Sequence, residues 1–287
     1  MLIDTHCHLT ATQFDADREA VLARAQAAGV MAMVTIATDL SDAVAVATLA
    51  AAQPAVYAAV GIHPNEAAHL SPDWPEQLRA LAGRPRVVAI GEIGLDYYWR
   101  RVPEEVQKSV LRQQLDLAAA LGLPVILHDR EAHDDLRAEL RDWVQRRVPG
   151  TPLAARPFVG VLHSFSGDRA MAAEACAWGF VLGVAGPVTF PKARDLQALV
   201  RDLPPERVVV ETDSPYLAPH PYRGRRNEPA HVALVAAKLA ELWGLPVAQV
   251  AAITTATACR LFGLGATPAA ELPDPRRGPT LTKPEAA

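Results

Sequence analysis

The fold is decided by the stretch Leu2-Ile3-Asp4-Thr5-His6-Cys7-His8-Leu9, an apolar strand start that ends in polar side chains. In an extended strand, side chains two residues apart point to the same face. His6 and His8 therefore converge, and Asp4 shares their face. Two imidazoles at the tip of a strand indicate a metal site, so the rest of the chain must supply the sheet that carries it.

Seven further apolar runs alternate with helical stretches. The eight expected strands are Leu2–Leu9, Val30–Ala37, Val56–His63, Val87–Glu92, Pro124–His128, Phe158–Phe165, Phe180–Val184 and Arg207–Asp213. Clear helices are expected at Asp15–Ala28, Pro103–Leu121, Ala170–Trp178, Glu228–Trp243 and Pro246–Phe262. This alternation predicts an α/β fold, a (β/α)8 TIM barrel over residues 1–265 with its metal site at the carboxyl ends of the strands. An open doubly wound sheet is the rival, but no Gly-x-Gly-x-x-Gly follows the first strand.

The carboxyl ends of later strands carry more side chains of the metal-binding type. These are His63, Glu92, His128, His163 and Asp213. Imidazole and carboxylate suit Zn²⁺ and Mn²⁺, whereas Mg²⁺ prefers oxygen. We therefore predict two divalent ions: one bound by His6, His8 and Asp213, the other by His128 and His163, with Glu92 between them. Two ions about 3.5–4 Å apart activate a water and stabilise the leaving oxygen of an in-line displacement.

Four residues at or near the predicted ligands need a separate interpretation of their role. Asp213 is also a candidate acceptor for the proton of the attacking water. Cys7 faces away from the histidines and is predicted to be a small buried hydrophobe. His133 is predicted to lie on a solvated helix face. Glu211 shares the parity of Asp213, and two roles stay open for it: support of a metal ligand, or support of the strand end.

Composition limits the class of protein. The 287 residues are 50% hydrophobic with a net charge of -4, which suits one large core and argues against a long footprint on duplex nucleic acid. Three widely spaced cysteines predict a reducing, cytoplasmic location. Neither a leader sequence nor an apolar run of about 18 residues is seen, so no membrane is expected. A monomer is expected, with a surface loop at 149–157 and a disordered Pro/Ala-rich tail at 266–287.

Seven ordered motifs resemble the TatD family of metal-dependent deoxyribonucleases. They are Asp-Thr-His-Cys-His-Leu (4–9), Gly-Ile-His-Pro (61–64), Gly-Glu-Ile-Gly-Leu-Asp-Tyr (91–97), Leu-Pro-Val-Ile-Leu-His (123–128), His-Ser-Phe-Ser-Gly (163–167), Glu-Thr-Asp-Ser-Pro-Tyr-Leu (211–217) and Arg-Asn-Glu-Pro (226–229). The resemblance implies an amidohydrolase-type barrel with two metals that hydrolyses DNA, often as a 3′-to-5′ exonuclease. It also implies that the family's ligands match His6, His8, Glu92, His128, His163 and Asp213. Glu92 stands where wider metal barrels often carry a modified lysine, which favours the TatD-like branch.

A phosphodiester substrate needs cationic or amide donors around it. The predicted substrate contacts are Lys192, Arg223, Arg225 and Arg226, whereas Arg100 and Arg101 are interpreted as surface charges. For His63, a phosphate contact or a proton-transfer role is expected. Four aromatic residues are candidates for stacking on bases, and for Tyr97 and Phe165 core packing is an equal alternative: Tyr97, Tyr98, Trp99 and Phe165.

Two catalytic functions compete. The first is metal-dependent hydrolysis of single-stranded DNA ends. Whether RNA is also a substrate stays open. The second is hydrolysis of an ester or amide bond such as that of aminoacyl-tRNA, because metal-bound hydroxide also attacks carbonyls. A non-catalytic binding barrel is disfavoured, since no ligand position holds an inert residue. Affinity favours Zn²⁺ or Mn²⁺ as the native ion, while cellular availability favours Mg²⁺.

Overall fold

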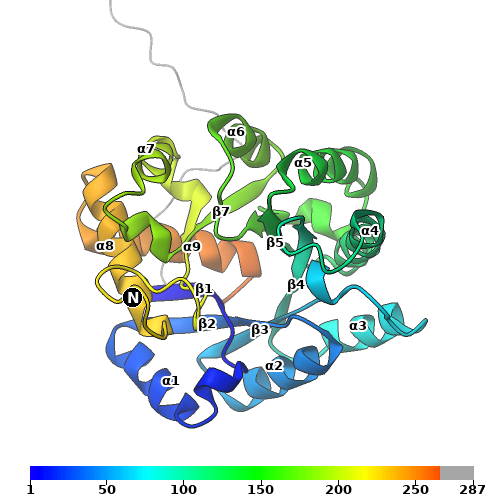
Figure 1. Ribbon diagram of the computed structural model, residues 1–287, viewed down its shortest axis with the longest axis horizontal. Helices are drawn as coiled ribbons and strands as arrows, with labels where there is room; N and C mark the ends of the chain where they lie inside the picture. Colours follow the sequence, from blue (N-terminus) through cyan, green and yellow to red (C-terminus); the bar gives the residue numbers. More distant parts are fainter. Residues whose placement is uncertain (266–287) are drawn as a thin grey trace, which may run out of the picture.

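A computed structural model describes residues 1–265 and confirms the predicted barrel. Eight parallel strands are hydrogen-bonded in chain order around a nearly closed sheet, with helices outside it (Figure 1). The strands are β1 Leu2–Cys7, β2 Val30–Ile36, β3 Val56–Val60, β4 Val87–Asp96, β5 Val125–Arg130, β6 Gly160–Leu162, β7 Phe180–Val184 and β8 Val208–Val210. The tail predicted at 266–287 lies outside the described residues.

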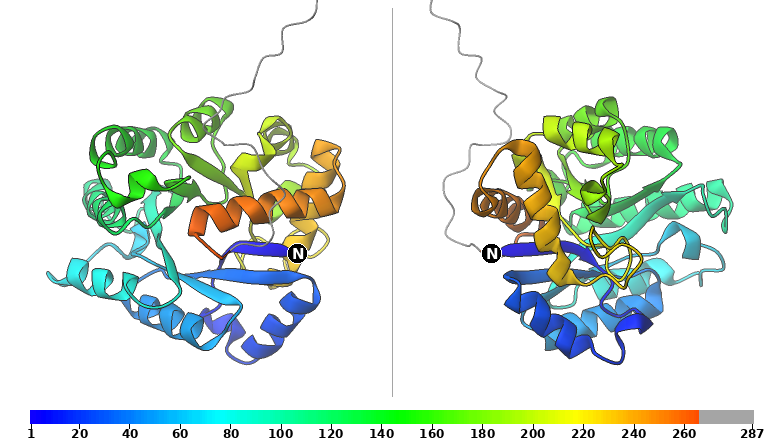
Figure 2. Two further views of the ribbon diagram at one scale, coloured as in Figure 1. Left: turned by 180° about the vertical axis from the view of Figure 1, so that it is seen from behind. Right: turned by 60° about the vertical axis from the view of Figure 1, so that its left-hand side comes forward.

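Helices follow the strands and cover the outside of the barrel. They are α1 Arg18–Ala27, α2 Leu40–Ala52, α3 Trp74–Ala82, α4 Glu104–Leu121, α5 His133–Asp142, α6 Arg169–Ala177, α7 Arg194–Asp202, α8 Val232–Trp243 and α9 Val247–Phe262. Helix α9 departs from the ring and lies across the rear of the barrel, as the view from behind shows (Figure 2). There Ala258, Leu261 and Phe262 pack in one buried cluster with strand residues such as Ile3 and Val161. The carboxyl ends of the strands are thus left as the open end of the barrel.

The strand ends differ from their predicted positions in ways that shape the site. β3 stops at Val60, β6 at Leu162 and β8 at Val210, so His63, His163 and Asp213 lie in the turns that follow. β4 continues to Asp96, four residues past its predicted end at Glu92, because it pairs with β5 as far as Asp96 and Arg130. The polar residues are therefore placed by short turns above a buried sheet.

The seam between β1 and β8 closes the barrel with few hydrogen bonds. The His8 backbone N–H donates to the Ser214 carbonyl at 2.7 Å, and the Asp213 N–H donates to the His6 carbonyl at 2.8 Å. The buried Asp4 carboxylate accepts from the Thr212 backbone N–H at 2.9 Å and from the Thr212 hydroxyl at 2.6 Å. Asp4 therefore ties the first strand to the last one just below the histidines, rather than joining them.

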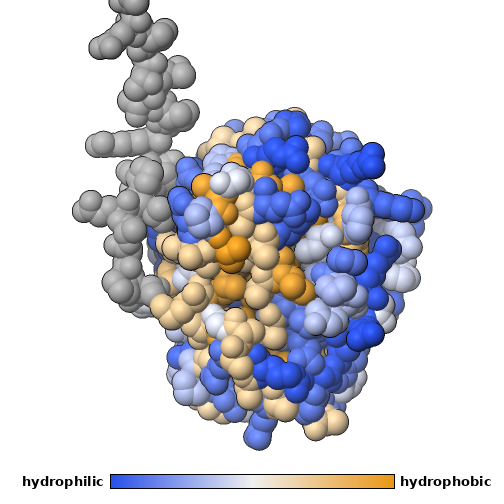
Figure 3. Space-filling model, turned by 90° about the vertical axis from the view of Figure 1, so that its left-hand side faces the viewer, coloured by the Kyte–Doolittle hydropathy of each residue, from blue (hydrophilic) through white to orange (hydrophobic). Residues whose placement is uncertain are grey.

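Helices α8 and α9 are both apolar and are separated by only a short turn. Within residues 1–265, no single helix is long and apolar enough to cross a membrane; only the two segments Pro229–Trp243 and Val247–Phe262 together reach the required length and composition, and they are bent by 111°. Both helices turn apolar residues such as Val235, Leu239 and Leu261 into the core. On the side of the molecule where α8 lies, apolar surface gathers near the centre and hydrophilic residues border it (Figure 3).

Candidate metal centre

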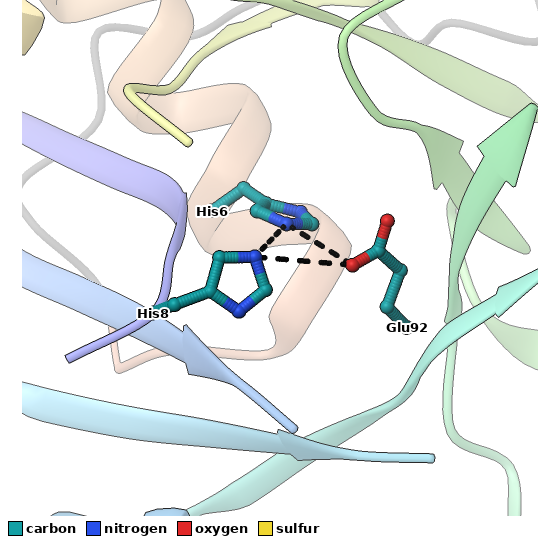
Figure 4. Close-up of side chains that lie close together, drawn as sticks. All are labelled: His6, His8 and Glu92. Carbon is teal, nitrogen blue, oxygen red and sulfur yellow. Dashed lines mark hydrogen bonds and ion pairs between the residues drawn. The ribbon is translucent and has the colours of Figure 1, made fainter. Parts of the chain in front are cut away.

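Residues from β1 and β4 meet at the open end of the barrel. Figure 4 shows His6, His8 and Glu92 pointing toward one another. His6 Nε2 lies 3.6 Å and His8 Nε2 3.9 Å from Glu92 Oε2, and the two nitrogens are 3.3 Å apart. Asp213 Oδ1 completes the group, at 3.3 Å from His8 Nε2 and 3.6 Å from His6 Nε2. The four side chains predicted around one ion thus share one pocket.

The other oxygen of Glu92 faces a second group. Glu92 Oε1 lies 2.8 Å from His128 Nδ1 and 2.8 Å from His163 Nε2. The two oxygens of this one carboxylate therefore face different pairs of imidazoles, Oε2 toward His6 and His8 and Oε1 toward His128 and His163. This is the arrangement expected of a residue between two ions, and all six predicted ligands are brought together.

Glycine at position 94 allows this close approach of β4 and β5. Gly94 has φ of +150°, and a Cβ added there would lie 2.0 Å from the His128 carbonyl oxygen. The space taken by a side chain at most strand positions is here occupied by the backbone of the next strand. The motif Gly-Glu-Ile-Gly thus brings Glu92 within hydrogen-bond distance of His128.

Burial and the mutual contacts of these groups determine their protonation. Burial raises the pKa of Glu92, but the neighbouring His163 and His128 outweigh it and hold that pKa well below its usual range. Burial and the stacked His163 ring, 3.9 Å from the His6 ring between centroids, hold the pKa of His6 well below its usual range. For His163, Glu92 and Glu211 overcome the effect of burial and raise the pKa well above its usual range. The pocket therefore holds ionised carboxylate that attracts positive charge.

The donor set fits divalent metal ions. Three overlapping groups of residues each offer imidazole nitrogen and carboxylate oxygen atoms. Within each group these atoms lie within 4.8 Å of one another, and the groups are His6, His8 and Glu92; His6, His163 and Glu211; and His63, Glu92 and His128. His8 Nδ1 lies 3.1 Å from the Ile36 carbonyl oxygen, so it carries the hydrogen and leaves a lone pair on Nε2 facing Glu92. Such an outer hydrogen bond is characteristic of histidine that binds metal.

Asp96 is a site residue that the sequence analysis missed. Its Oδ2 lies 3.2 Å from His128 Nε2 and accepts from Asn65 Nδ2 at 3.0 Å. Although burial raises the pKa of Asp96, the contact with His128 outweighs it, and the pKa lies below its usual range. An ionised Asp96 holds a hydrogen of His128 on Nε2 and turns Nδ1 toward Glu92 Oε1, 2.8 Å away, where a metal would replace that contact. The signal was available, because Asp96 is four residues after Glu92 and shares its strand face.

We expect Asp96→Asn to weaken divalent metal binding by about 10- to 100-fold, since a lost outer hydrogen bond no longer orients the ligand. The measurement is the Mn²⁺ affinity of metal-stripped protein, determined by calorimetric titration. Asp129→Asn is the matched control, because Asp129 follows His128 on β5 but bonds His133 at 2.7 Å instead. Equal Mn²⁺ affinities in Asp96→Asn and in the wild type would contradict this role.

Glu211 points inward, as its parity with Asp213 indicated. Its Oε1 accepts a hydrogen bond from the Ser164 backbone N–H and lies 3.6 Å from His163 Nδ1, and Thr5 Oγ1 donates to Oε2 at 3.5 Å. Both roles left open by the sequence therefore have contacts in the structure. Gly183 leaves room for this carboxylate, since a Cβ there would lie 2.4 Å from Glu211 Oε2.

His63 faces the pocket as a hydrogen-bond donor. Its Nδ1 accepts from the Asn65 backbone N–H at 3.1 Å, and its Nε2 lies 4.0 Å from Glu92 Oε1. Burial lowers the pKa of His63 to about 3, so the ring is neutral at neutral pH. With Nδ1 accepting, the ring hydrogen is on Nε2 and points toward the metal groups. This geometry favours the predicted contact with a substrate oxygen over a role as a metal ligand.

A cleft of about 620 Å³ opens above the candidate metal centre. Among residues 1–265 its lining includes Arg101 and Arg130, but not the predicted substrate contacts Lys192, Arg223, Arg225 and Arg226. Arg226 donates to Asp17 Oδ1 at 2.7 Å and to Glu228 Oε1 at 2.9 Å. Phosphate binding by those four residues stays a prediction, and for Arg226 it would require release from these carboxylates. Arg101, interpreted from sequence as a surface charge, is exposed and also lies on the cleft wall.

Comparisons with known proteins agree with this geometry. A family model described as TatD related DNase matches residues 3–263. The metal-dependent hydrolase YabD of Bacillus subtilis is 38% identical, over 91% of this chain and 99% of that protein. The 3′-5′ ssDNA/RNA exonuclease TatD of Cronobacter sakazakii is 37% identical, over 93% and 100%. The crystal structure of YjjV, a TatD homologue from Escherichia coli K12, superposes with a TM-score of 0.83 at 35% identity, over 92% and 98%.

Proposed function

The chain belongs to the family of TatD-related DNases, which makes it a metal-dependent hydrolase, and on that premise we propose that it shortens single-stranded DNA, and RNA, from the 3′ end. One observation carries the proposal: the two carboxylate oxygens of Glu92 face different pairs of imidazoles. A carboxylate in that position suits a pair of ions in phosphodiester hydrolysis. A relative at 37% identity bears the name of a 3′-5′ ssDNA/RNA exonuclease, which supports the same substrate.

Two residues of the chain would accept the proton of the attacking water and orient the substrate phosphate. Divalent ions bound by these ligands would lower the pKa of a water and stabilise the charge on the leaving oxygen. Asp213 lies beside His8 with its carboxylate partly exposed to the cleft, where it would accept the proton of the attacking water. His63, with its hydrogen on Nε2, would donate a hydrogen bond to a phosphate oxygen. Water adds to phosphorus as the bond to the 3′ oxygen of the preceding nucleotide breaks, and that oxygen takes up a proton to become the 3′ hydroxyl of the shortened strand.

The surroundings of the site favour a single-stranded end. The net charge of -4 leaves no broad cationic surface for a duplex. The cationic side chains on the cleft wall are few, which is enough for the few phosphates next to a chain end. The monomeric state and cytoplasmic location expected from the sequence stay predictions, and so does the identity of the metal.

We expect metal-stripped protein to leave a 5′-labelled single-stranded oligonucleotide intact, and to shorten it stepwise after Mg²⁺, Mn²⁺ or Zn²⁺ is added. The same DNA labelled at its 3′ end is expected to release its label as a mononucleotide from the first turnover. The measurement is a time course resolved on a denaturing gel, with initial rates compared among the three ions. Blunt duplex of the same sequence is the matched substrate control and is expected to react more slowly.

An aminoacyl ester of tRNA is assayed under the same conditions to test the second function. If fully metallated protein cleaves that ester and leaves DNA and RNA intact, the exonuclease proposal is wrong while the hydrolase assignment stands. Release of label first from the 5′ end would reject the proposed polarity alone.

A further inference from the structure

We propose that Trp99, Arg101 and Arg130 form a nucleotide-binding wall of the cleft, where the indole stacks on a base and the two guanidinium groups bind the adjacent phosphates. The inference rests on the proposed nuclease function and goes further, because it assigns the recognition of single-stranded nucleic acid to particular residues. All three line the cleft that also contains Glu92 and His128. We call these three residues the Trp99 wall.

The indole of Trp99 is unusually open for a tryptophan. Its exposed fraction is 52%, and that of the adjacent Tyr98 is 48%. The two other aromatic candidates are engaged elsewhere: Tyr97 donates its hydroxyl to Asp135 at 2.7 Å, and Phe165 is buried in the core. A large apolar ring left in water at the edge of a polar cleft is suited to stacking, and stacking tolerates any base because each has a π face.

The two arginines are held on aromatic rings without a carboxylate partner. The Arg130 guanidinium lies 4.0 Å from the centroid of the Tyr98 ring and 5.6 Å from that of Trp99, and Arg101 lies 5.5 Å from that of Trp99. Within the described residues 1–265, neither arginine forms an ion pair, in contrast to Arg226. Stacking limits the motion of a guanidinium while its N–H groups stay free for phosphate.

One carboxylate links the Trp99 wall to the metal centre. Asp96 Oδ1 accepts from the backbone N–H groups of Tyr98 and Trp99, each at 3.0 Å, while its Oδ2 contacts His128 Nε2 at 3.2 Å. Arg130 lies two residues after His128 on β5 and so shares its strand face. The position of the indole and of Arg130 relative to the ligand His128 is therefore determined by short, local connections. A nucleotide stacked there would have its phosphates close to the metal ligands.

The first test measures affinity without cleavage. A fluorescent single-stranded oligonucleotide with phosphorothioate linkages, which resist hydrolysis, is titrated with metal-loaded protein and followed by anisotropy. We expect Trp99→Leu to raise Kd by about 5- to 100-fold. A series of oligonucleotides that each lack one base near the 3′ end identifies the stacked nucleotide. For one member of the series, wild type and Trp99→Leu are expected to bind equally.

The second test assigns the phosphate contacts through salt dependence. Each phosphate contact with single-stranded DNA contributes about 0.7 to the slope of log K against log salt. Arg101→Gln and Arg130→Gln are each expected to reduce the slope by about that amount. Arg146→Gln is the matched control, because Arg146 is exposed, pairs with Asp142 at 2.9 Å and does not line the cleft. Its slope is expected to equal that of the wild type.

The outcomes separate this inference from the function on which it rests. If the wild type shortens DNA while Trp99→Leu has unchanged Kd and KM, the Trp99 wall is wrong and the nuclease proposal stands. An equal loss of affinity on every oligonucleotide of the base-deleted series would also reject base stacking, because it would indicate a displaced loop. A wild type that neither binds nor cleaves single strands would overturn both.

Discussion

Glu92→Gln is expected to reduce the rate of phosphodiester hydrolysis by about 10³-fold or more while the barrel stays folded. The amide is nearly isosteric, so the pocket keeps its shape. It is neutral, however, and its nitrogen has no lone pair for a metal, so one of the two imidazole pairs would lose its shared anionic oxygen. Both the 2.8 Å contacts of Oε1 and the longer contacts of Oε2 depend on the carboxylate.

The measurement is the initial rate on single-stranded DNA at saturating Mn²⁺, together with the metal content of the purified protein. Glu66→Gln is the matched control, because Glu66 lines the same cleft but is exposed and forms no ion pair among the described residues. Its activity is expected to stay near that of the wild type. A Glu92→Gln variant with more than a tenth of the normal rate would rule out the bridging role.

Gly94→Ala is expected to lower the free energy of unfolding by about 4 kcal/mol or more and to abolish activity. Two costs add at this position. A φ of +150° is nearly restricted to glycine, and the new Cβ would lie 2.0 Å from the His128 carbonyl oxygen. Because that oxygen belongs to backbone, no side-chain rotation relieves the clash, and β4 and β5 must separate.

Gly29→Ala separates the two costs. Gly29 has a positive φ of +84°, but nothing lies within 4 Å of an added Cβ. We expect this control to lose about 1 kcal/mol through backbone conformation alone. Urea denaturation of the two variants and the wild type gives the comparison. Similar losses in both variants would mean that β4 moves away from β5 at little cost.

Much of the fold and of the site could be predicted because parallel strands bring their carboxyl ends together. This geometry makes the distance along the chain between His6, Glu92 and Asp213 unimportant, so the position of each residue relative to its strand was sufficient. The eight apolar runs were visible for the same reason, since a strand buried on both faces has few polar residues.

The parts that were missed depend on where a strand ends and on contacts between distant segments. Asp96 was hidden because β4 was expected to end at Glu92, whereas pairing with β5 extends it. The hydrogen bond of Arg226 to Asp17, 209 residues away in the chain, is likewise indicated by no local pattern, while the predicted phosphate contact of Arg226 stays a prediction. The position of Arg101 on the cleft wall follows the turn that Asp96 holds at Tyr98 and Trp99. Loop direction of this kind follows from tertiary hydrogen bonds rather than from periodicity.

The seam between β1 and β8 sets the order of events during biosynthesis. His6 and His8 are synthesised about two hundred residues before the Ser214 and Thr212 groups that join β1 to the last strand. At translation speeds of about 5–20 residues per second, this interval is roughly 10–40 s. During that time the histidine pair lacks its neighbours from the last strand, Asp213 among them. A metal site that uses Asp213 together with His6 and His8 is therefore complete only after the last strand has docked.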